Sequence, residues 1–276
     1  KIKEFNGYRR VYTNEISNKD STELSIMKCI EQLTGSKVII PHTTLLCNEL
    51  TSSEEIIAFL YRAFYCKSNI LFTIINAEHL LIENRTIFIN TLKKITSEEP
   101  FSMVSCVMIF YKNRDNDIID QIQKFPFHKK ADISISSSNI DIIQSDNITI
   151  VDSNASGVGK SFLINKFAND NQKKYIYFPL GDELKKETII KRLCDLKIDS
   201  KTLLHLDLLE TNKAILMQDF LFSLLILHYY SYEDQYFVLD PEVVLKIEVP
   251  YGFFNFIDKY PILKLFKKTT ITKENK

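Results

Sequence analysis

Short runs of bulky apolar residues alternate with amphipathic segments along most of this chain of 276 residues. Apolar runs of about four to eight residues predict buried strands, whereas apolar residues at three- and four-residue spacing predict helices. Strands that are separated by helices of about ten or more residues usually pair in parallel, because a parallel pair needs a crossover. The fold class that we expect is therefore α/β, with a parallel sheet and helices on both of its faces.

The expected elements can be placed along the chain. Strands are expected at 44–47, 70–75, 103–111, 148–151, 175–178, 202–208, 237–239 and 243–249, and helices at 56–64, 85–95, 118–125, 160–167, 183–193 and 216–229. Two overlapping capping boxes, Thr51 with Glu54 and Ser52 with Glu55, predict where the first of these helices begins. The tyrosine-rich segment 229–236 is expected to be a turn with half-buried rings.

The charge balance limits the kinds of partner. Thirty-five basic residues face thirty-five acidic ones, so the net charge is +0, and no global field attracts nucleic acid or an anionic membrane. The most apolar stretch, Phe220–Leu227, is far shorter than the roughly 20 residues that span a bilayer. We therefore expect neither a nucleic-acid partner nor a transmembrane segment.

The cysteines indicate a reducing compartment. All five are widely spaced and none forms a C-x-x-C pair, which argues against a zinc knuckle; they are Cys29, Cys47, Cys66, Cys106 and Cys194. Several lie in apolar runs, as core thiols do. Because no basic-then-apolar leader follows Lys1, we expect a cytoplasmic protein. The missing initiator Met suggests a segment of a longer polypeptide.

Eight residues form the strongest chemical motif, Asn154-Ala155-Ser156-Gly157-Val158-Gly159-Lys160-Ser161. A predicted strand precedes them and a predicted helix follows, and Gly159, Lys160 and Ser161 match the phosphate loop G-x-x-x-x-G-K-[ST]. Backbone N–H groups of such a loop converge on a phosphate at the helix N-terminus. We therefore expect all eight residues and Phe162 to contact a nucleotide, with Lys160 reaching the β- and γ-phosphates.

One position departs from the phosphate-loop pattern, since Asn154 replaces the leading glycine. Asn is among the few other residues that tolerate left-handed backbone angles. The loop is therefore still expected to close.

A phosphate loop needs an acid on a neighbouring strand to direct Mg²⁺. The apolar run that ends in Asp207 resembles a Walker B strand, so Ser161 and Asp207 are the expected Mg²⁺ ligands. Leu208 occupies the place of the Glu that usually orients the attacking water, and Glu210 could substitute only if the chain turns there. We therefore expect nucleotide binding with slow or absent hydrolysis.

Other classes of phosphate-binding protein are disfavoured. The guanine-reading motif N-K-x-D is missing, since Asn212–Ile215 fails at its last position, and Arg192 is the only arginine after residue 146 for the lid of a kinase. The acids Asp115, Asp117 and Asp120 are expected to form a solvated turn rather than a metal site. His79 and His205 are expected to be core or rim histidines.

A polar stretch, 134–146, divides the chain into two expected domains. The first, 1–145, is an α/β region in which we expect no nucleotide site, because no glycine lies between Gly35 and Gly157 to build a phosphate cradle. The second, 146–276, is the expected P-loop nucleotide-binding domain, truncated at its C-terminal end.

Eight segments resemble, in the same order, parts of the mysterin-type giant AAA+ RING ubiquitin ligases. They are Pro41–Cys47, Thr51–Glu55, Phe59–Ala63, Asn76–Leu81, Asn154–Ser161, His205–Asp207, Leu221–Leu227 and Ile247–Pro250. The resemblance covers roughly residues 40 to 250. It implies an AAA+-like P-loop NTPase sheet in the second half, a degenerate AAA+-like or linking region in the first, and a place in a dynein-like array of such units.

The resemblance also implies cofactors and partners. ATP and Mg²⁺ would be held by Gly159, Lys160, Ser161 and Asp207, and neighbouring AAA+ units of the same polypeptide would be partners. Ubiquitin machinery would be reached through a parent ligase whose zinc-bearing regions lie elsewhere. Three functions stay open: an ATP-binding segment of a large ubiquitin ligase or mechanochemical ATPase, a non-hydrolysing ATP-locked scaffold module and, less favoured, a stand-alone P-loop phosphotransferase.

Overall fold

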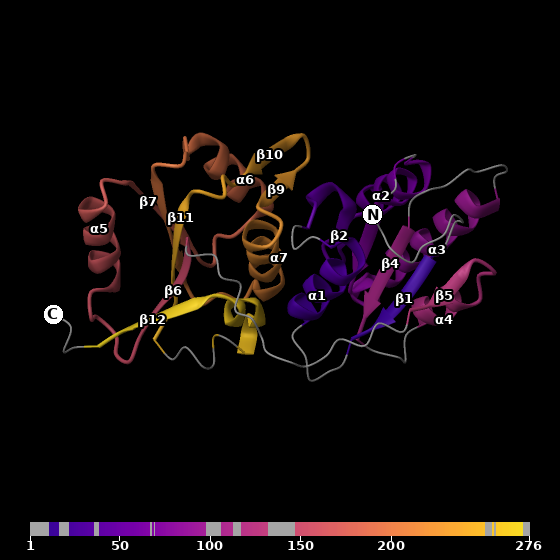
Figure 1. Cartoon of the computed structure of the whole chain (residues 1–276), viewed down its shortest axis with the longest axis horizontal. Helices are drawn as coiled ribbons and strands as arrows, with labels where there is room; N and C mark the ends of the chain where they lie inside the picture. Colours follow the sequence, from indigo (N-terminus) through magenta and orange to yellow (C-terminus); the bar gives the residue numbers. More distant parts are fainter. Residues whose placement is uncertain are drawn as a thin grey trace. The chain divides into compact units, whose positions relative to one another are not determined.

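The structure is a computed structural model that divides into two compact units, residues 1–137 and 138–276. It describes residues 11–16, 22–35, 39–66, 68, 70–97, 106–112, 117–131, 147–251, 256 and 258–272. The polar stretch 134–146, expected as the domain boundary, lies outside the described residues. Figure 1 shows the elements of both units, coloured along the sequence.

Unit 1 contains a five-stranded sheet with helices between its strands. The strands are β1 (Val11–Glu15), β2 (Thr44–Leu46), β3 (Leu71–Ile75), β4 (Cys106–Tyr111) and β5 (His128–Lys130), and the helices are α1 (Thr22–Thr34), α2 (Ser53–Tyr65), α3 (Ile82–Ser97) and α4 (Asp117–Gln123), with 3-10 turns η1 (Pro41–Thr43) and η2 (Ala77–His79). The sheet order is β2-β3-β4-β1-β5, and every neighbouring pair is parallel.

The core of unit 1 explains why its apolar runs were predictable. Every residue of β3 and β4 is buried, as expected for central parallel strands that are covered on both faces. Phe59 of α2 meets Phe72 of β3 edge to face, with ring centroids 5.8 Å apart. The predicted helix and strand alternation is thus confirmed in this unit.

One of the two expected capping boxes forms at the start of α2. The Ser52 hydroxyl accepts a hydrogen bond from the Glu55 N–H at 3.2 Å, and the Glu55 carboxylate accepts one from the Ser52 N–H at 2.8 Å. Thr51 makes a different bond, because its hydroxyl accepts from the Asn48 N–H at 2.9 Å. The box at Ser52 therefore fixes the first residue of the helix, and the predicted box at Thr51 is wrong.

Unit 2 contains a second five-stranded sheet and a hairpin. The sheet strands are β6 (Ile148–Ser153), β7 (Lys174–Leu180), β8 (Thr202–Leu208), β11 (Val244–Glu248) and β12 (Lys267–Ile271). The helices are α5 (Lys160–Asp170), α6 (Lys186–Asp195) and α7 (Ala214–Leu225). The hairpin strands are β9 (Tyr229–Tyr232) and β10 (Gln235–Val238), and η3 (Pro261–Leu265) is a 3-10 turn. The sheet order is β12-β6-β11-β8-β7, again with all neighbours parallel.

The two units share one strand order. When the five sheet strands of each unit are numbered in chain order, both sheets read 5-1-4-3-2. In each sheet the first strand lies inside, between the fifth and the fourth, so the chain crosses to opposite sides of it. The carboxyl end of such a strand is a topological switch point, where open α/β sheets bind ligands.

Helices cover both faces of the sheet of unit 2. Phe178 of β7 stacks on Phe220 of α7 at 6.3 Å, and Phe220 meets Tyr230 of the hairpin at 5.2 Å. The opposite face carries α5, whose Phe167 ring lies 4.6 Å from the Lys246 ammonium of β11. Figure 1 shows α5 and α7 on opposite sides of this sheet.

Two expectations for unit 2 need correction. The helix expected to continue to Tyr229 ends at Leu225, and the segment expected to be a turn forms the antiparallel hairpin β9–β10. His228 and Glu233 take left-handed backbone angles, at φ +51° and +53°, which stop the helix and turn the hairpin. The apolar spacing of the helix continued past this break and concealed it.

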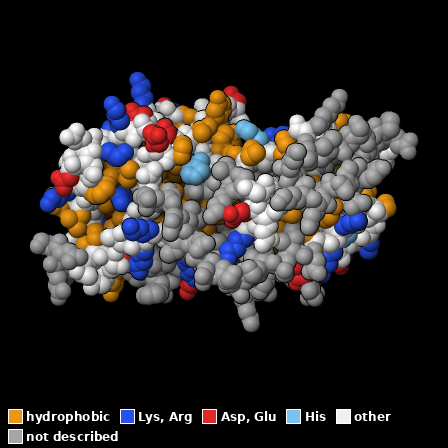
Figure 2. Space-filling model, viewed as in Figure 1, with side chains coloured by type: hydrophobic (Ala, Val, Ile, Leu, Met, Phe, Trp, Pro, Cys, Tyr) orange, Lys and Arg blue, Asp and Glu red, His pale blue; other side chains and the backbone are white. Residues whose placement is uncertain are grey.

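Surface charge and cysteines agree with the sequence analysis. Figure 2 shows acidic and basic side chains interspersed among the described residues on the face drawn. Cys29, Cys47 and Cys106 are buried, and burial raises the pKa of the Cys29 thiol to about 12. Among the described residues, no helix is long and apolar enough to cross a membrane.

We predict that Ser52→Ala lowers the free energy of unfolding by about 1 kcal/mol, because the Glu55 N–H loses its acceptor. Urea denaturation followed by circular dichroism measures the change. Ser53→Ala, one residue further into the helix, is the matched control and should change the free energy by less than about 0.5 kcal/mol. Equal losses in both variants would contradict the capping role.

We predict that Phe220→Ala costs about 3–5 kcal/mol, because a fully buried ring leaves a cavity between β7 and the hairpin. Phe162→Ala is the control, since its side chain is 70% exposed, and it should be nearly neutral. The same denaturation experiment compares them, and a small loss for Phe220→Ala would argue against this core.

Candidate functional site

The loop after β6 has the backbone that the motif predicts. The strand ends at Ser153 and α5 begins at Lys160. Gly157 and Gly159 take left-handed angles, at φ +69° and +84°, and Gly159 is the residue that caps α5. We expected Asn154 to replace glycine by taking a left-handed backbone angle. Asn154 is not among the residues with positive φ, so the loop does not use such an angle at this position.

The first turn of α5 offers donors. Among the described residues, none accepts a hydrogen bond from the backbone N–H groups of Lys160, Ser161 or Phe162. The first backbone hydrogen bond of the helix runs from the Leu163 N–H to the Gly159 carbonyl, at 3.0 Å. Unbonded N–H groups at a helix N-terminus, with the helix dipole behind them, attract anions.

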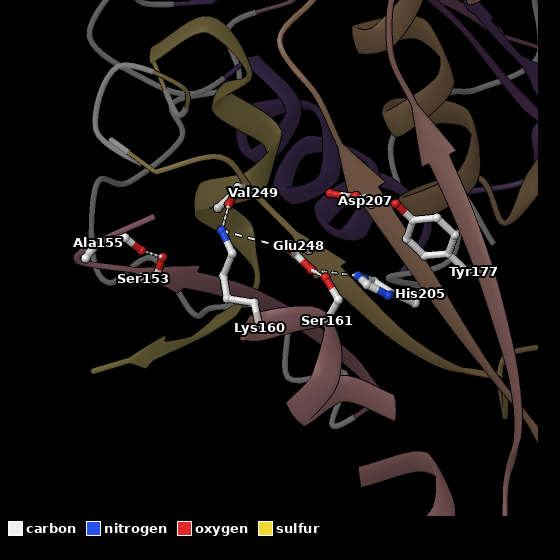
Figure 3. A network of polar contacts seen from close by, with 9 residues as sticks. All are labelled: Ser153, Ala155, Lys160, Ser161, Tyr177, His205, Asp207, Glu248 and Val249. Carbon is white, nitrogen blue, oxygen red and sulfur yellow. Dashed lines mark hydrogen bonds and ion pairs between the residues drawn. The ribbon is translucent and has the colours of Figure 1, made fainter. Parts of the chain in front are cut away.

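The two polar side chains of that turn point to one acid. Lys160 Nζ donates to the Val249 carbonyl at 2.6 Å and lies 3.6 Å from Glu248 Oε1. The Ser161 hydroxyl donates to Glu248 Oε2 at 2.8 Å. Figure 3 shows Lys160 and Ser161 on either side of this carboxylate. The sequence analysis did not single out Glu248.

Glu248 occupies this place because of the sheet order. It ends β11, which lies between β6 and β8, and its Cα pairs with those of Val151 and Asp207. Behind it, His205 Nε2 lies 3.1 Å from Oε2, while the Tyr175 hydroxyl lies 2.7 Å from His205 Nδ1. His205 is fully buried, so the expectation of a core histidine is confirmed.

The surroundings of Glu248 favour its charged form. Burial alone would raise the pKa of this carboxyl, but hydrogen bonds from His205 and Ser161 and the charge of Lys160 outweigh burial, so its pKa is lowered. Glu248 is therefore an anion held against the phosphate-loop lysine and serine.

Asp207 has another partner. Its Oδ2 accepts the Tyr177 hydroxyl at 2.6 Å, and this bond is the main reason that the pKa of Tyr177 is raised. Among the described residues, Asp207 lies within ion-pair distance of neither Lys160 nor another cation. The neighbouring strand, rather than that of Asp207, thus supplies the acid that contacts Lys160 and Ser161.

The chain leaves β8 after Leu208, which is buried. Glu210 lies beyond the strand and lines a cavity of about 590 Å³ at the carboxyl ends of β7, β8 and β11. Its other lining residues are Asp182, Thr211, Asn212, Pro250, Tyr251, Phe256 and Lys259. Pro250 follows Val249, whose carbonyl accepts Lys160, so the cavity begins next to the loop.

Unit 1 differs at the corresponding positions. Between β1 and α1 the sequence 16–21 contains no glycine. After its third strand, Glu78 is buried, its Oε1 accepts the Lys112 N–H at 2.8 Å, and its carbonyl accepts Arg85 Nη2 at 2.6 Å. The Glu78 carboxylate therefore links the segment after β3 to the residue after β4.

The remaining candidates are the acids near the start of α4. Asp117 pairs with Arg85 at 3.1 Å, and Asp115 lies outside the described residues. In the part of the chain that the structure describes, no group of three or more His, Cys, Asp or Glu side chains could hold a metal ion.

Together, two parallel α/β units and a strand–loop–helix with Lys and Ser at the helix start define an AAA+ P-loop-like fold. Residues 21–126 match the profile of the family described as the RNF213 AAA domain. Unit 1 therefore contains an AAA domain of the RNF213 type, and the resemblance to mysterin-type proteins is confirmed. The match supports an AAA+ segment of an RNF213-like protein within residues 21–126. No curated protein matches it.

We predict that Gly159→Ala destabilises unit 2 by about 1–2 kcal/mol, because a Cβ at this left-handed position is strained even though its contact with the Phe162 Cβ, at 3.9 Å, is an ordinary one. Gly181→Ala is the control: its φ is not left-handed, and its Cβ would meet the Leu209 side chain, with Cδ1 at 3.2 Å and Cβ at 3.4 Å. Thermal or urea unfolding compares the two, and equal losses would contradict the account.

Proposed function

We propose that unit 2 binds ATP with Mg²⁺ at the loop after β6. One observation supports this most strongly: Lys160 and Ser161 begin a helix directly after a parallel strand, behind two glycines with left-handed angles. In this proposal residues 146–276 form a P-loop domain and residues 1–145 an AAA+-like region without a nucleotide site.

The residues present fit a bound triphosphate. Unbonded N–H groups, the Lys160 ammonium and the Ser161 hydroxyl all lie at the start of α5, and a carboxylate already contacts both side chains. A phosphate is an anion with similar oxygen acceptors, so it would find the same donors. In the proposal, Asn154 to Phe162 line the phosphates, and Ser161 and Asp207 hold Mg²⁺.

Each side chain has a separate task. Lys160 would bind the β- and γ-phosphates and neutralise their charge, and the N–H groups of Gly157 to Ser161 would orient them. Bound Mg²⁺ would supply further charge neutralisation. Ser161 would have to release Glu248 before its oxygen could take part.

A second candidate is a module that keeps ATP without hydrolysing it. Leu208, buried at the end of β8, supports this candidate, since an aliphatic side chain cannot orient water. A ligand that binds only the folded state would then stabilise unit 2. A stand-alone phosphotransferase is less favoured, because Arg192 stacks on Phe178 at 4.1 Å and is not placed for a lid.

The family match over residues 21–126 supports a proposal about the wider role. We propose that the parent polypeptide is a cytoplasmic ubiquitin ligase, that neighbouring AAA+ units of that polypeptide contact this segment, and that ubiquitin machinery acts through regions outside it.

We predict that Lys160→Ala weakens Mg-ATP binding by about 10- to 100-fold, because a charged donor to phosphate is lost. Titration with a fluorescent ATP analogue measures the dissociation constant, and chromatography of the purified protein shows whether bound nucleotide is ATP or ADP. Lys166→Ala, an exposed lysine on the same helix, is the matched control. Retained affinity in Lys160→Ala, or no binding by the wild type, would refute the proposal.

A further inference from the structure

Glu248 is the acid that the phosphate loop contacts, and none of the expected roles uses it. Its carboxylate takes the Ser161 hydroxyl at 2.8 Å and lies 3.6 Å from Lys160 Nζ. Only 12% of its side chain is exposed. A nucleotide bound at this loop needs Lys160 and Ser161, which both contact Glu248 in this structure. It must therefore compete with the Glu248 carboxylate for them.

His205 lies against the carboxylate on the side away from the loop. His205 Nε2 lies 3.1 Å from Glu248 Oε2, and the Tyr175 hydroxyl holds the other ring nitrogen at 2.7 Å. His205 is fully buried in β8, so its ring has little freedom to move. When phosphates draw Lys160 away, Glu248 therefore keeps a partner and stays beside Ser161.

The spacing of the Ser161 and Glu248 oxygens is compatible with two ligands of one cation. Magnesium binds oxygen at about 2.0–2.1 Å in octahedral geometry, which places neighbouring ligand oxygens about 2.9 Å apart. Ser161 Oγ and Glu248 Oε2 are separated by 2.8 Å. Asp207, one strand further from the loop, is instead bonded to Tyr177.

We propose that Glu248 couples Mg²⁺ to nucleotide binding: with the cation present, its carboxylate holds the ion or the water bound to it beside Ser161, and without the cation it competes with phosphate for Lys160. This inference rests on the proposed nucleotide site. It assigns to β11 a cation-binding acid in addition to the one expected on β8.

The competition follows from charge. Without Mg²⁺, a triphosphate brings several negative charges toward a carboxylate that is already ionised and partly buried, and like charges in such a place repel strongly. With Mg²⁺, the same carboxylate faces a divalent cation and attracts it. The sign of its effect on nucleotide binding therefore changes with the cation.

The test measures the affinity of a fluorescent, non-hydrolysable ATP analogue in Mg²⁺ and in EDTA. We expect Mg²⁺ to tighten binding by the wild type at least about tenfold. In Glu248→Gln, which keeps the shape and removes the charge, binding in EDTA should tighten several-fold and the Mg²⁺ enhancement should fall below about threefold. Glu242→Gln, an exposed acid before the amino end of β11, should behave as the wild type.

A second variant separates loss of the charge from unfolding of unit 2. Glu248→Asp keeps the charge but shortens the side chain, so it should retain part of the enhancement, and unchanged melting temperatures in both variants show that unit 2 is folded. If Glu248→Gln keeps the full Mg²⁺ enhancement and Asp207→Asn loses it, the role proposed for Glu248 is overturned, while the nucleotide site stands. Absence of analogue binding by the wild type in both conditions would overturn the nucleotide site itself, and this inference with it.

Discussion

All five strands of the second sheet run in one direction, so the residues that end them meet along a single edge. The loop after β6, the acid that ends β11 and the acid near the end of β8 lie at this edge on neighbouring strands. An antiparallel strand anywhere among these three would place its carboxyl end at the opposite edge. The contacts between Glu248, Lys160 and Ser161 therefore depend on the crossover helices that keep the strands parallel.

Central features were predictable because their signals are local. The bulky runs of β3 and β8 and the capping box at Ser52 depend on a few neighbouring residues. Two of the four edge strands were missed: β5 carries exposed Lys side chains and β12 exposed Lys and Thr side chains, so neither contains an apolar run. Strand β1 was missed because its buried positions include Thr13 and Asn14, whose polar side chains weaken the pattern.

The role of Glu248 could not be predicted for a different reason. The expected motif places Asp207 as the acid nearest to the loop. Which strand lies next to the loop depends on the strand order, which is a property of the whole sheet and not of a local motif. The order 5-1-4-3-2 inserts β11 between β6 and β8, so an acid that lies far along the chain becomes the neighbour of the loop. Unit 1 has the same strand order, but there the buried acid Glu78, which follows β3, accepts a hydrogen bond from the backbone of Lys112.

The account claims one nucleotide site in the chain, in unit 2, and none in unit 1. Equilibrium dialysis against radiolabelled ATP in Mg²⁺ measures the number of sites directly. We predict saturation at one nucleotide per chain, whereas a plateau at two, or no bound nucleotide at saturating ATP, would contradict it.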